Sequence, residues 1–196
     1  FLRTAAGAKG LVLDLRGNGG GLVANLQHLL GLLAPEGTPT GTSVTRPMAE
    51  RFRSEAGGDP NDMVAVAKWN GPSMKTRTQS VPPYAGRIAV LINGRSGSAS
   101  EIVSAVLRER REAVLVGRRS AGAVLVSQFA PLRDGFEVQI PLSDYVTPGG
   151  MRLEKNGLVP DVEVEDPRRG TEDRAIPVAV KELEARFAAG KSNRKR

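Results

Sequence analysis

The sequence predicts an α/β domain on the strength of two observations. Short apolar runs typical of buried strands alternate with segments whose apolar residues recur at three and four positions, as in an amphipathic helix. The chain has 196 residues, 40% of them hydrophobic and 25% charged, which fits one domain with a sizeable core. The alternation of strands and helices favours a sheet with substantial parallel pairing.

The first half of the chain begins with a strand, a turn and a helix. GLVLDLR (10–16) is an apolar run that predicts a strand, and the glycine-rich turn GNGGG (17–21) follows it. LVANLQHLLGLLA (22–34) has the leucine spacing of a helix with a broad buried face. Glycine, proline and threonine are frequent in the region that follows, where SVTRPM (43–48) and MVAVAKW (63–69) are the candidates for short strands.

The second half repeats the alternation. SASEIVSAVLRERRE (98–112) predicts an amphipathic helix, because apolar residues line one face and charged residues the other. DRAIPVAVKELEARFAAG (173–190) predicts a terminal helix with Pro177 in its first turn. The extended segments predicted in this half are GRIAVLI (86–92), AVLVG (113–117), VLVSQFAPL (124–132) and FEVQIPLSDYVT (136–147), the last two on either side of the turn RDG.

Composition excludes several classes of function. The chain has no cysteine and one histidine, so we expect no disulfide, no thiolate chemistry, no metal and no cofactor. The net charge of +7 is spread along the chain, and its densest run, the tail KSNRKR (191–196), is interpreted as a solvated end. Aromatic residues make up only 4%, too few for a base-stacking platform, so we expect no nucleic-acid partner. No apolar run reaches the ~18 residues that a membrane-spanning helix needs.

The glycine turn GNGGG has two interpretations. It is not a dinucleotide-binding fingerprint, because that spacing requires glycine where Leu22 stands. It is either a simple reversal of the chain or a site at which several backbone N–H groups converge on an anion, as in an oxyanion hole.

The stretch NGRSGSASEIVSAVL (93–107) raises a similar choice. Ser98 and Glu101 have the spacing of a capping box, in which the serine satisfies free N–H groups at the start of its helix. A serine on a glycine-flanked turn at a helix N-terminus is also well placed to be a nucleophile, with the N–H of the next residue beside it. Local pattern does not decide between these roles.

Four motifs in order and spacing resemble the C-terminal processing (tail-specific) family of serine proteases. They are LVLDLRGNGGG, GRIAVLINGRSGSASEI, VLVGRRSAGAVLVSQ and YVTPGGMRLEKNGLVPDVEVE. The resemblance implies the β-spiral core shared with ClpP and crotonase. It makes residues 1–196 a catalytic core domain without the helical and PDZ regions that family members carry upstream, and a chain that begins with Phe1 is expected to be an excised fragment or a mature domain.

The resemblance also implies site residues. Ser98 matches the nucleophile, and the N–H of Ala99, with one from Gly19 or Gly20, would form the oxyanion hole. The common branch of the family has a lysine as general base 25 residues after the serine, where this chain has Ala123. The supporting glutamine of that branch falls on Ser127, with Gln128 one position further. The serine–lysine dyad is therefore absent.

A second branch, which includes the tricorn core protease, uses a serine–histidine–serine–glutamate tetrad. Glu154 fits the position of the glutamate, with a surface charge paired to Arg152 or Lys155 as the alternative. The histidine and second serine of the tetrad lie upstream of the glycine turn, and His28 does not match their position. The general base is therefore expected from a segment missing here, and the isolated chain is expected to be weakly active or inactive.

The resulting hypothesis is a serine endopeptidase core that acts on polypeptides and comes from an exported protein, with the oligomeric state left open. One alternative is a non-catalytic domain of the same fold that binds a peptide or another ligand, which the alanine at position 123 favours. The other is a crotonase-like enzyme acting on acyl thioesters, which would leave Ser98 unexplained.

Overall fold

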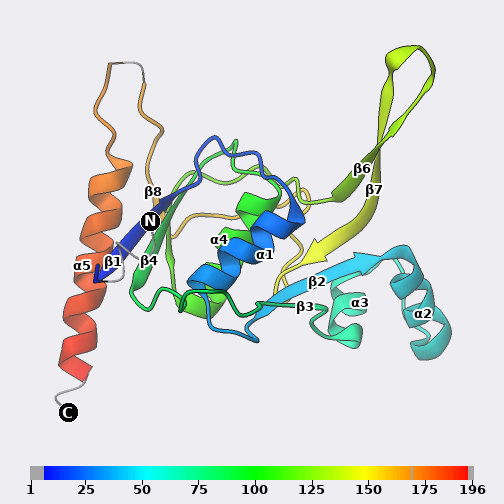
Figure 1. Cartoon of the computed structure of the whole chain (residues 1–196), viewed down its shortest axis with the longest axis horizontal. Helices are drawn as coiled ribbons and strands as arrows, with labels where there is room; N and C mark the ends of the chain where they lie inside the picture. Colours follow the sequence, from blue (N-terminus) through cyan, green and yellow to red (C-terminus); the bar gives the residue numbers. More distant parts are fainter. Residues whose placement is uncertain (1–6, 169, 194–196) are drawn as a thin grey trace.

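The computed structural model describes residues 7–168 and 170–193, which form two four-stranded sheets with helices packed around them (Figure 1). The first sheet is parallel, as predicted, with the strand order β1-β4-β5-β8. Its strands are β1 (Gly10–Asp14), β4 (Arg87–Ile92), β5 (Val114–Gly117) and β8 (Val162–Glu163). None of the helices in the described ranges is long and apolar enough to cross a membrane.

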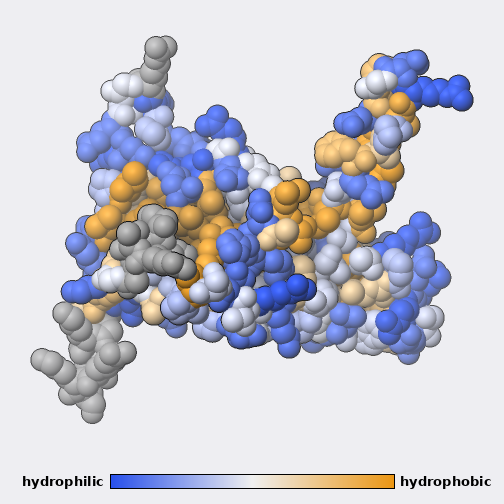
Figure 2. Space-filling view, viewed as in Figure 1, coloured by the Kyte–Doolittle hydropathy of each residue, from blue (hydrophilic) through white to orange (hydrophobic). Residues whose placement is uncertain are grey.

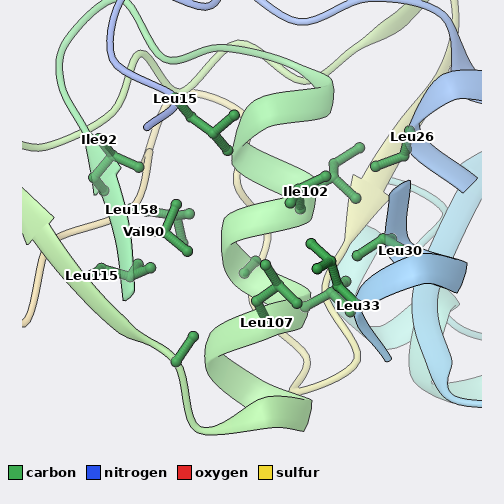
Figure 3. Close-up of a cluster of buried hydrophobic side chains, with 14 of the residues drawn as sticks. Leu15, Leu26, Leu30, Leu33, Val90, Ile92, Ile102, Leu107, Leu115 and Leu158 are labelled. Atoms are coloured by element: carbon green, nitrogen blue, oxygen red, sulfur yellow. The ribbon is translucent and has the colours of Figure 1, made fainter. Parts of the chain in front are cut away.

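Helices cover both faces of the parallel sheet (Figure 1). They are α1 (Val23–Leu33), α4 (Ala99–Arg111) and α5 (Ala175–Asn193). Strand β4 alternates between two apolar clusters, because successive side chains point to opposite faces: Val90 packs on the α1 and α4 side, and Leu91 packs on the α5 side. Figure 3 shows the larger cluster, in which Val90, Leu115 and Leu158 lie on the sheet side of α4, and Ile102 points to Leu26 and Leu30 of α1 on its other side.

The second sheet is antiparallel, with the strand order β3-β2-β7-β6. Its strands are β2 (Pro39–Thr45), β3 (Met74–Lys75), β6 (Val126–Pro131) and β7 (Glu137–Val146), and the short helix η1 (Arg133–Gly135) connects the last two. The β6–β7 hairpin projects from the body of the molecule (Figure 1). Helices α2 (Arg46–Ala56) and α3 (Met63–Asn70) pack at the base of this sheet.

Two candidate strands are corrected by the structure. MVAVAKW forms α3, because Asp62 accepts a hydrogen bond from the Ala65 N–H at 2.9 Å and caps a helix there. Of SVTRPM only the first three residues are in a strand, since Thr45 is the N-cap of α2 and Pro47 lies in the first turn of that helix. The other predicted strands and helices are confirmed to within a few residues. The charged tail is helical to Asn193, and its last three residues lie outside the described part of the chain.

Candidate active site

Ser98 lies at the N-terminus of α4, where the chain leaves the carboxyl end of β4. Its backbone has φ of +51° and ψ of −119°, a conformation rarely adopted by residues other than glycine. Non-glycine residues in such regions carry a strain of about 1–3 kcal/mol and concentrate at functional sites. The Ser98 N–H donates to the carbonyl of Ala123 at 2.8 Å, so a second loop holds this turn in place.

Glu101 is a buried carboxylate that fastens the Ser98 turn to the loop after β5. Its side chain is fully buried and accepts hydrogen bonds from the Ser120 hydroxyl at 2.5 Å, the Gly122 N–H at 2.8 Å and the Ala123 N–H at 2.9 Å. It also accepts from the Ser98 N–H at 3.2 Å, which is one arm of the predicted capping box, and the Glu101 N–H donates to the Ser98 carbonyl at 3.0 Å.

The glycine turn lies against the same serine. A Cβ atom added at Gly20 would come within 2.6 Å of the Ser98 Cβ and 3.0 Å of the Ala99 nitrogen, so only glycine fits there. Asn18 ties the turn to the serine loop, because its Oδ1 accepts from the Gly20 N–H at 2.9 Å and its carbonyl accepts from the Gly97 N–H at 3.1 Å. Since the Gly20 N–H is already used, Gly19 is the better donor for an oxyanion.

Arg16 anchors the base of this turn. Its guanidinium donates to Asp14 at 2.7 Å and to Asp173 at 2.6 Å, and thereby joins the end of β1 to the segment before α5. These hydrogen bonds hold the pKa of Asp173 below its ordinary value.

Ser98 opens onto a cavity of about 490 Å³ at the foot of the β6–β7 hairpin. The cavity brings together three residues predicted for the site from distant parts of the sequence, namely Ser98, Gly19 and Glu154. The other two, Ala99 and Gly20, line an adjoining apolar groove of about 200 Å³ between α1 and α4. All five predicted residues therefore lie around one turn, although their catalytic roles stay predictions.

Glu154 is half-buried, and its Oε2 accepts a hydrogen bond from the Val124 N–H at 2.9 Å. The alternative of a surface ion pair with Arg152 is not what the structure has, because Arg152 pairs with Asp144 at 2.7 Å. The hydrogen bond to Val124 instead holds the carboxylate beside the cavity, where it could orient a neighbouring group.

No histidine or lysine lines this cavity in the described ranges. Ala123, at the position of the family's lysine, lines the cavity, and its methyl group cannot accept a proton. His28 is exposed on α1. The geometry thus has a candidate nucleophile and candidate oxyanion donors, without a general base.

Sequence reasoning missed Asn18, and it gave Glu101 only a capping role. Both residues hold backbone N–H groups that lie close to Ser98. An acidic residue on a helix whose first nine residues are otherwise small or apolar was the available signal for Glu101, because such a carboxylate requires several donors when it is buried.

Replacing Gly20 with alanine is expected to lower the free energy of unfolding by about 1–3 kcal/mol, because the new Cβ collides with Ser98 at a φ of +110°. Chemical denaturation measures the change. Gly21→Ala is the matched control, since an added Cβ meets nothing within 4 Å there. Equal losses in the two variants would contradict the close approach of Gly20 to Ser98.

A serine in a strained turn at a helix N-terminus, next to a glycine turn, is an arrangement typical of serine hydrolases. The chain belongs to peptidase family S41, whose family model matches residues 1–164. It is 30% identical over 159 residues to the chloroplastic C-terminal processing peptidase of Tetradesmus obliquus, an alignment covering 81% of this chain and 29% of that relative. The predicted family resemblance is confirmed.

Solved structures confirm the fold. The photosystem II D1 C-terminal processing protease matches with a TM-score of 0.58 and 26% identity, over 83% of this chain and 36% of that one. The tricorn protease matches with a TM-score of 0.58 and 21% identity, over 94% of this chain and 16% of that one, which shows the shared fold alone. The chain therefore spans about a third or less of these relatives.

Proposed function

We propose that this chain is the catalytic core of a serine endopeptidase that cleaves extended polypeptides, with Ser98 as the nucleophile. The observation that carries the proposal is the strained backbone of Ser98 at the start of α4, beside a cavity that also contains Gly19 and Glu154. Strand β6 is an edge strand whose start borders this cavity, so a substrate can add to the sheet there as a further strand.

In the proposed reaction the Ser98 oxygen attacks the carbonyl carbon of the scissile peptide bond. The negative charge that develops on the carbonyl oxygen is stabilised by the N–H groups of Ala99 and Gly19, each contributing about 3 kcal/mol to lowering the barrier. Glu154 is the supporting carboxylate. A general base from a segment outside these 196 residues accepts the serine proton, as in the tetrad branch.

Domain organisation and location follow from the same proposal. Residues 1–196 form one catalytic core domain, and the whole protein acts outside the cytoplasm or in an organelle. Relatives named as chloroplastic peptidases support a location in an organelle.

A second candidate is a non-catalytic domain of the same fold that binds polypeptides. Ala123 favours it, because the position that carries the base in the common branch has no proton acceptor. The two candidates differ in whether Ser98 can react once a base is available.

Exogenous imidazole tests the proposal directly. The cavity beside Ser98 is open, so imidazole can enter and take the proton while the serine oxygen bonds to the phosphorus of a fluorophosphonate and fluoride leaves. We expect imidazole to accelerate labelling of the chain by about tenfold or more, in proportion to the free-base form of imidazole. The label is followed by fluorescence after electrophoresis.

Ser98→Ala is the control for this experiment and is expected to show no imidazole-dependent labelling. A labelling rate that is the same in Ser98→Ala and in the unmodified chain would refute the assigned nucleophile. No acceleration of the unmodified chain would favour the binding domain.

A further inference from the structure

A second cavity lies on the other side of the hairpin's foot, between α2 and β7. Its volume is about 600 Å³, and it shares two lining residues, Leu125 and Pro141, with the cavity of Ser98. Leu125 directly precedes the edge strand β6, so the two cavities meet at the start of that edge. A polypeptide that reaches Ser98 along this edge can therefore extend into the second cavity.

The base of the second cavity is apolar. Val44, Ala49 and Met63 line it and belong to the apolar cluster that joins α2 and α3 to the antiparallel sheet. Leu125 and Leu142 line it as well, although they are 37% and 49% exposed. An apolar side chain placed here would remove this surface from water, at about 25 cal/mol per Å².

Exposed apolar side chains of β7 extend from the second cavity along the projecting hairpin. Val138 and Ile140 lie two residues apart on β7, so they point to one face, and Leu142 follows at an irregularity in the pairing with β6; each of the three is exposed by more than a third. Gln139 lies between them on the opposite face and lines the Ser98 cavity. Figure 2 shows apolar surface on the projecting hairpin and at its foot. These three side chains therefore form an apolar strip that runs along β7 from the second cavity.

Two arginines, Arg46 and Arg53, and two carboxylates, Glu50 and Asp144, line the cavity. Arg46 and Arg53 line it, and Arg53 forms no ion pair within residues 7–168 and 170–193, whereas Arg46 pairs with Glu50 at 2.9 Å. The carboxylate of Asp144, which also lines the cavity, is paired with Arg152 at 2.7 Å. Arg53 is therefore the cationic group left to pair with a ligand.

We propose that this cavity is a second subsite for the substrate, which takes an apolar side chain of an extended polypeptide and places a nearby carboxylate against Arg53. The carboxylate comes from an acidic residue or from the C-terminus of the polypeptide. The proposal rests on the proposed function, because continuity with the Ser98 cavity is what makes the occupant a substrate.

Peptide binding to the Ser98→Ala chain tests the subsite, since this variant cannot react. Three fluorescein-labelled peptides of alanine and leucine are compared by anisotropy: one with a free C-terminal carboxylate, one with a C-terminal amide, and one amidated with a penultimate glutamate. We expect Leu142→Asp to weaken binding of all three by about tenfold or more. Arg53→Ala is expected to weaken only carboxylate-bearing peptides, by about threefold to tenfold.

The peptide whose affinity falls in Arg53→Ala identifies the source of the carboxylate. Val180→Asp on α5 is the matched control for Leu142→Asp, because Val180 is exposed to a similar degree, at 42%. Arg110→Ala removes an exposed arginine on α4 that lies outside the cavity. Both control variants are expected to bind all three peptides with the affinity of the Ser98→Ala chain that carries no second substitution.

Equal affinities in Leu142→Asp and Val180→Asp would overturn the subsite. A change from dimer to monomer in Leu142→Asp, with peptide affinity unchanged, would assign the cavity to a contact between two copies and would also overturn it. Imidazole-dependent labelling of Ser98 is measured separately. If imidazole does not accelerate labelling of the unmodified chain, the proposed function fails, whereas peptide binding that depends on Leu142 still supports a polypeptide subsite in this cavity.

Discussion

Replacing Ala123 with lysine is expected to accelerate fluorophosphonate labelling of Ser98 by about 10²-fold in the absence of imidazole, because a positioned general base contributes about 10²–10⁴ to such reactions. Ala123 lines the Ser98 cavity and its carbonyl accepts the Ser98 N–H at 2.8 Å, so a lysine side chain there starts beside the nucleophile. The rate constant is measured from the time course of labelling.

Labelling of Ala123→Lys is expected to depend on pH. Glu154 lines the same cavity, and a carboxylate near the new lysine favours its charged form and raises its pKa. Labelling of Ala123→Lys should therefore rise with pH as the amine loses its proton. Adding Glu154→Gln should move that rise to lower pH.

Ala121→Lys is the matched control, because residue 121 is exposed, lies two residues earlier and does not line the cavity. It is expected to leave labelling unchanged. Equal acceleration by the two lysines would show that the effect does not depend on position and would contradict the placement of Ala123.

Replacing Glu101 with alanine is expected to lower the free energy of unfolding by about 3–5 kcal/mol, because buried donors that lose their acceptor cost about 1–3 kcal/mol each. The donors are the Ser120 hydroxyl and the N–H groups of Gly122 and Ala123. Urea denaturation followed by circular dichroism measures the change.

Glu109→Ala is the control for this loss. Glu109 is on the same helix but only partly buried, and it accepts a hydrogen bond from the Gly149 N–H at 2.6 Å. It is expected to cost about 1 kcal/mol or less. If Glu101→Ala were no less stable than Glu109→Ala, Glu101 would not hold the two loops together.

The strand–turn–helix unit that carries Ser98 was predictable because its signals are local. The apolar run of β4, the glycine and serine turn, and the apolar stripe of α4 are all read from adjacent residues. The same reasoning failed at α3, where valines two residues apart in MVAVAKW imitate the period of a strand. The cap from Asp62 and the burial of Val66 in the tertiary structure decide for a helix there.

The surroundings of Ser98 were less predictable, because they join segments far apart in the sequence. Glu101 finds its donors about 20 residues further along, in a loop that reaches it only when β4 and β5 pair. The family resemblance indicated Gly19 and Glu154, whereas only the structure places them around one cavity. The cavity between α2 and β7 had no sequence signal at all, since its lining comes from several separate segments.

Locating the fluorophosphonate label by mass spectrometry tests most directly whether Ser98 is the nucleophile. Trypsin releases the segment from Ser96 to Arg108, which contains four serines: Ser96, Ser98, Ser100 and Ser104. After reaction with a fluorophosphonate in imidazole, the fragment ions of this peptide should place the added mass on Ser98. An adduct on Ser96, Ser100 or Ser104, or an unmodified peptide, would contradict the assignment of Ser98 as the nucleophile.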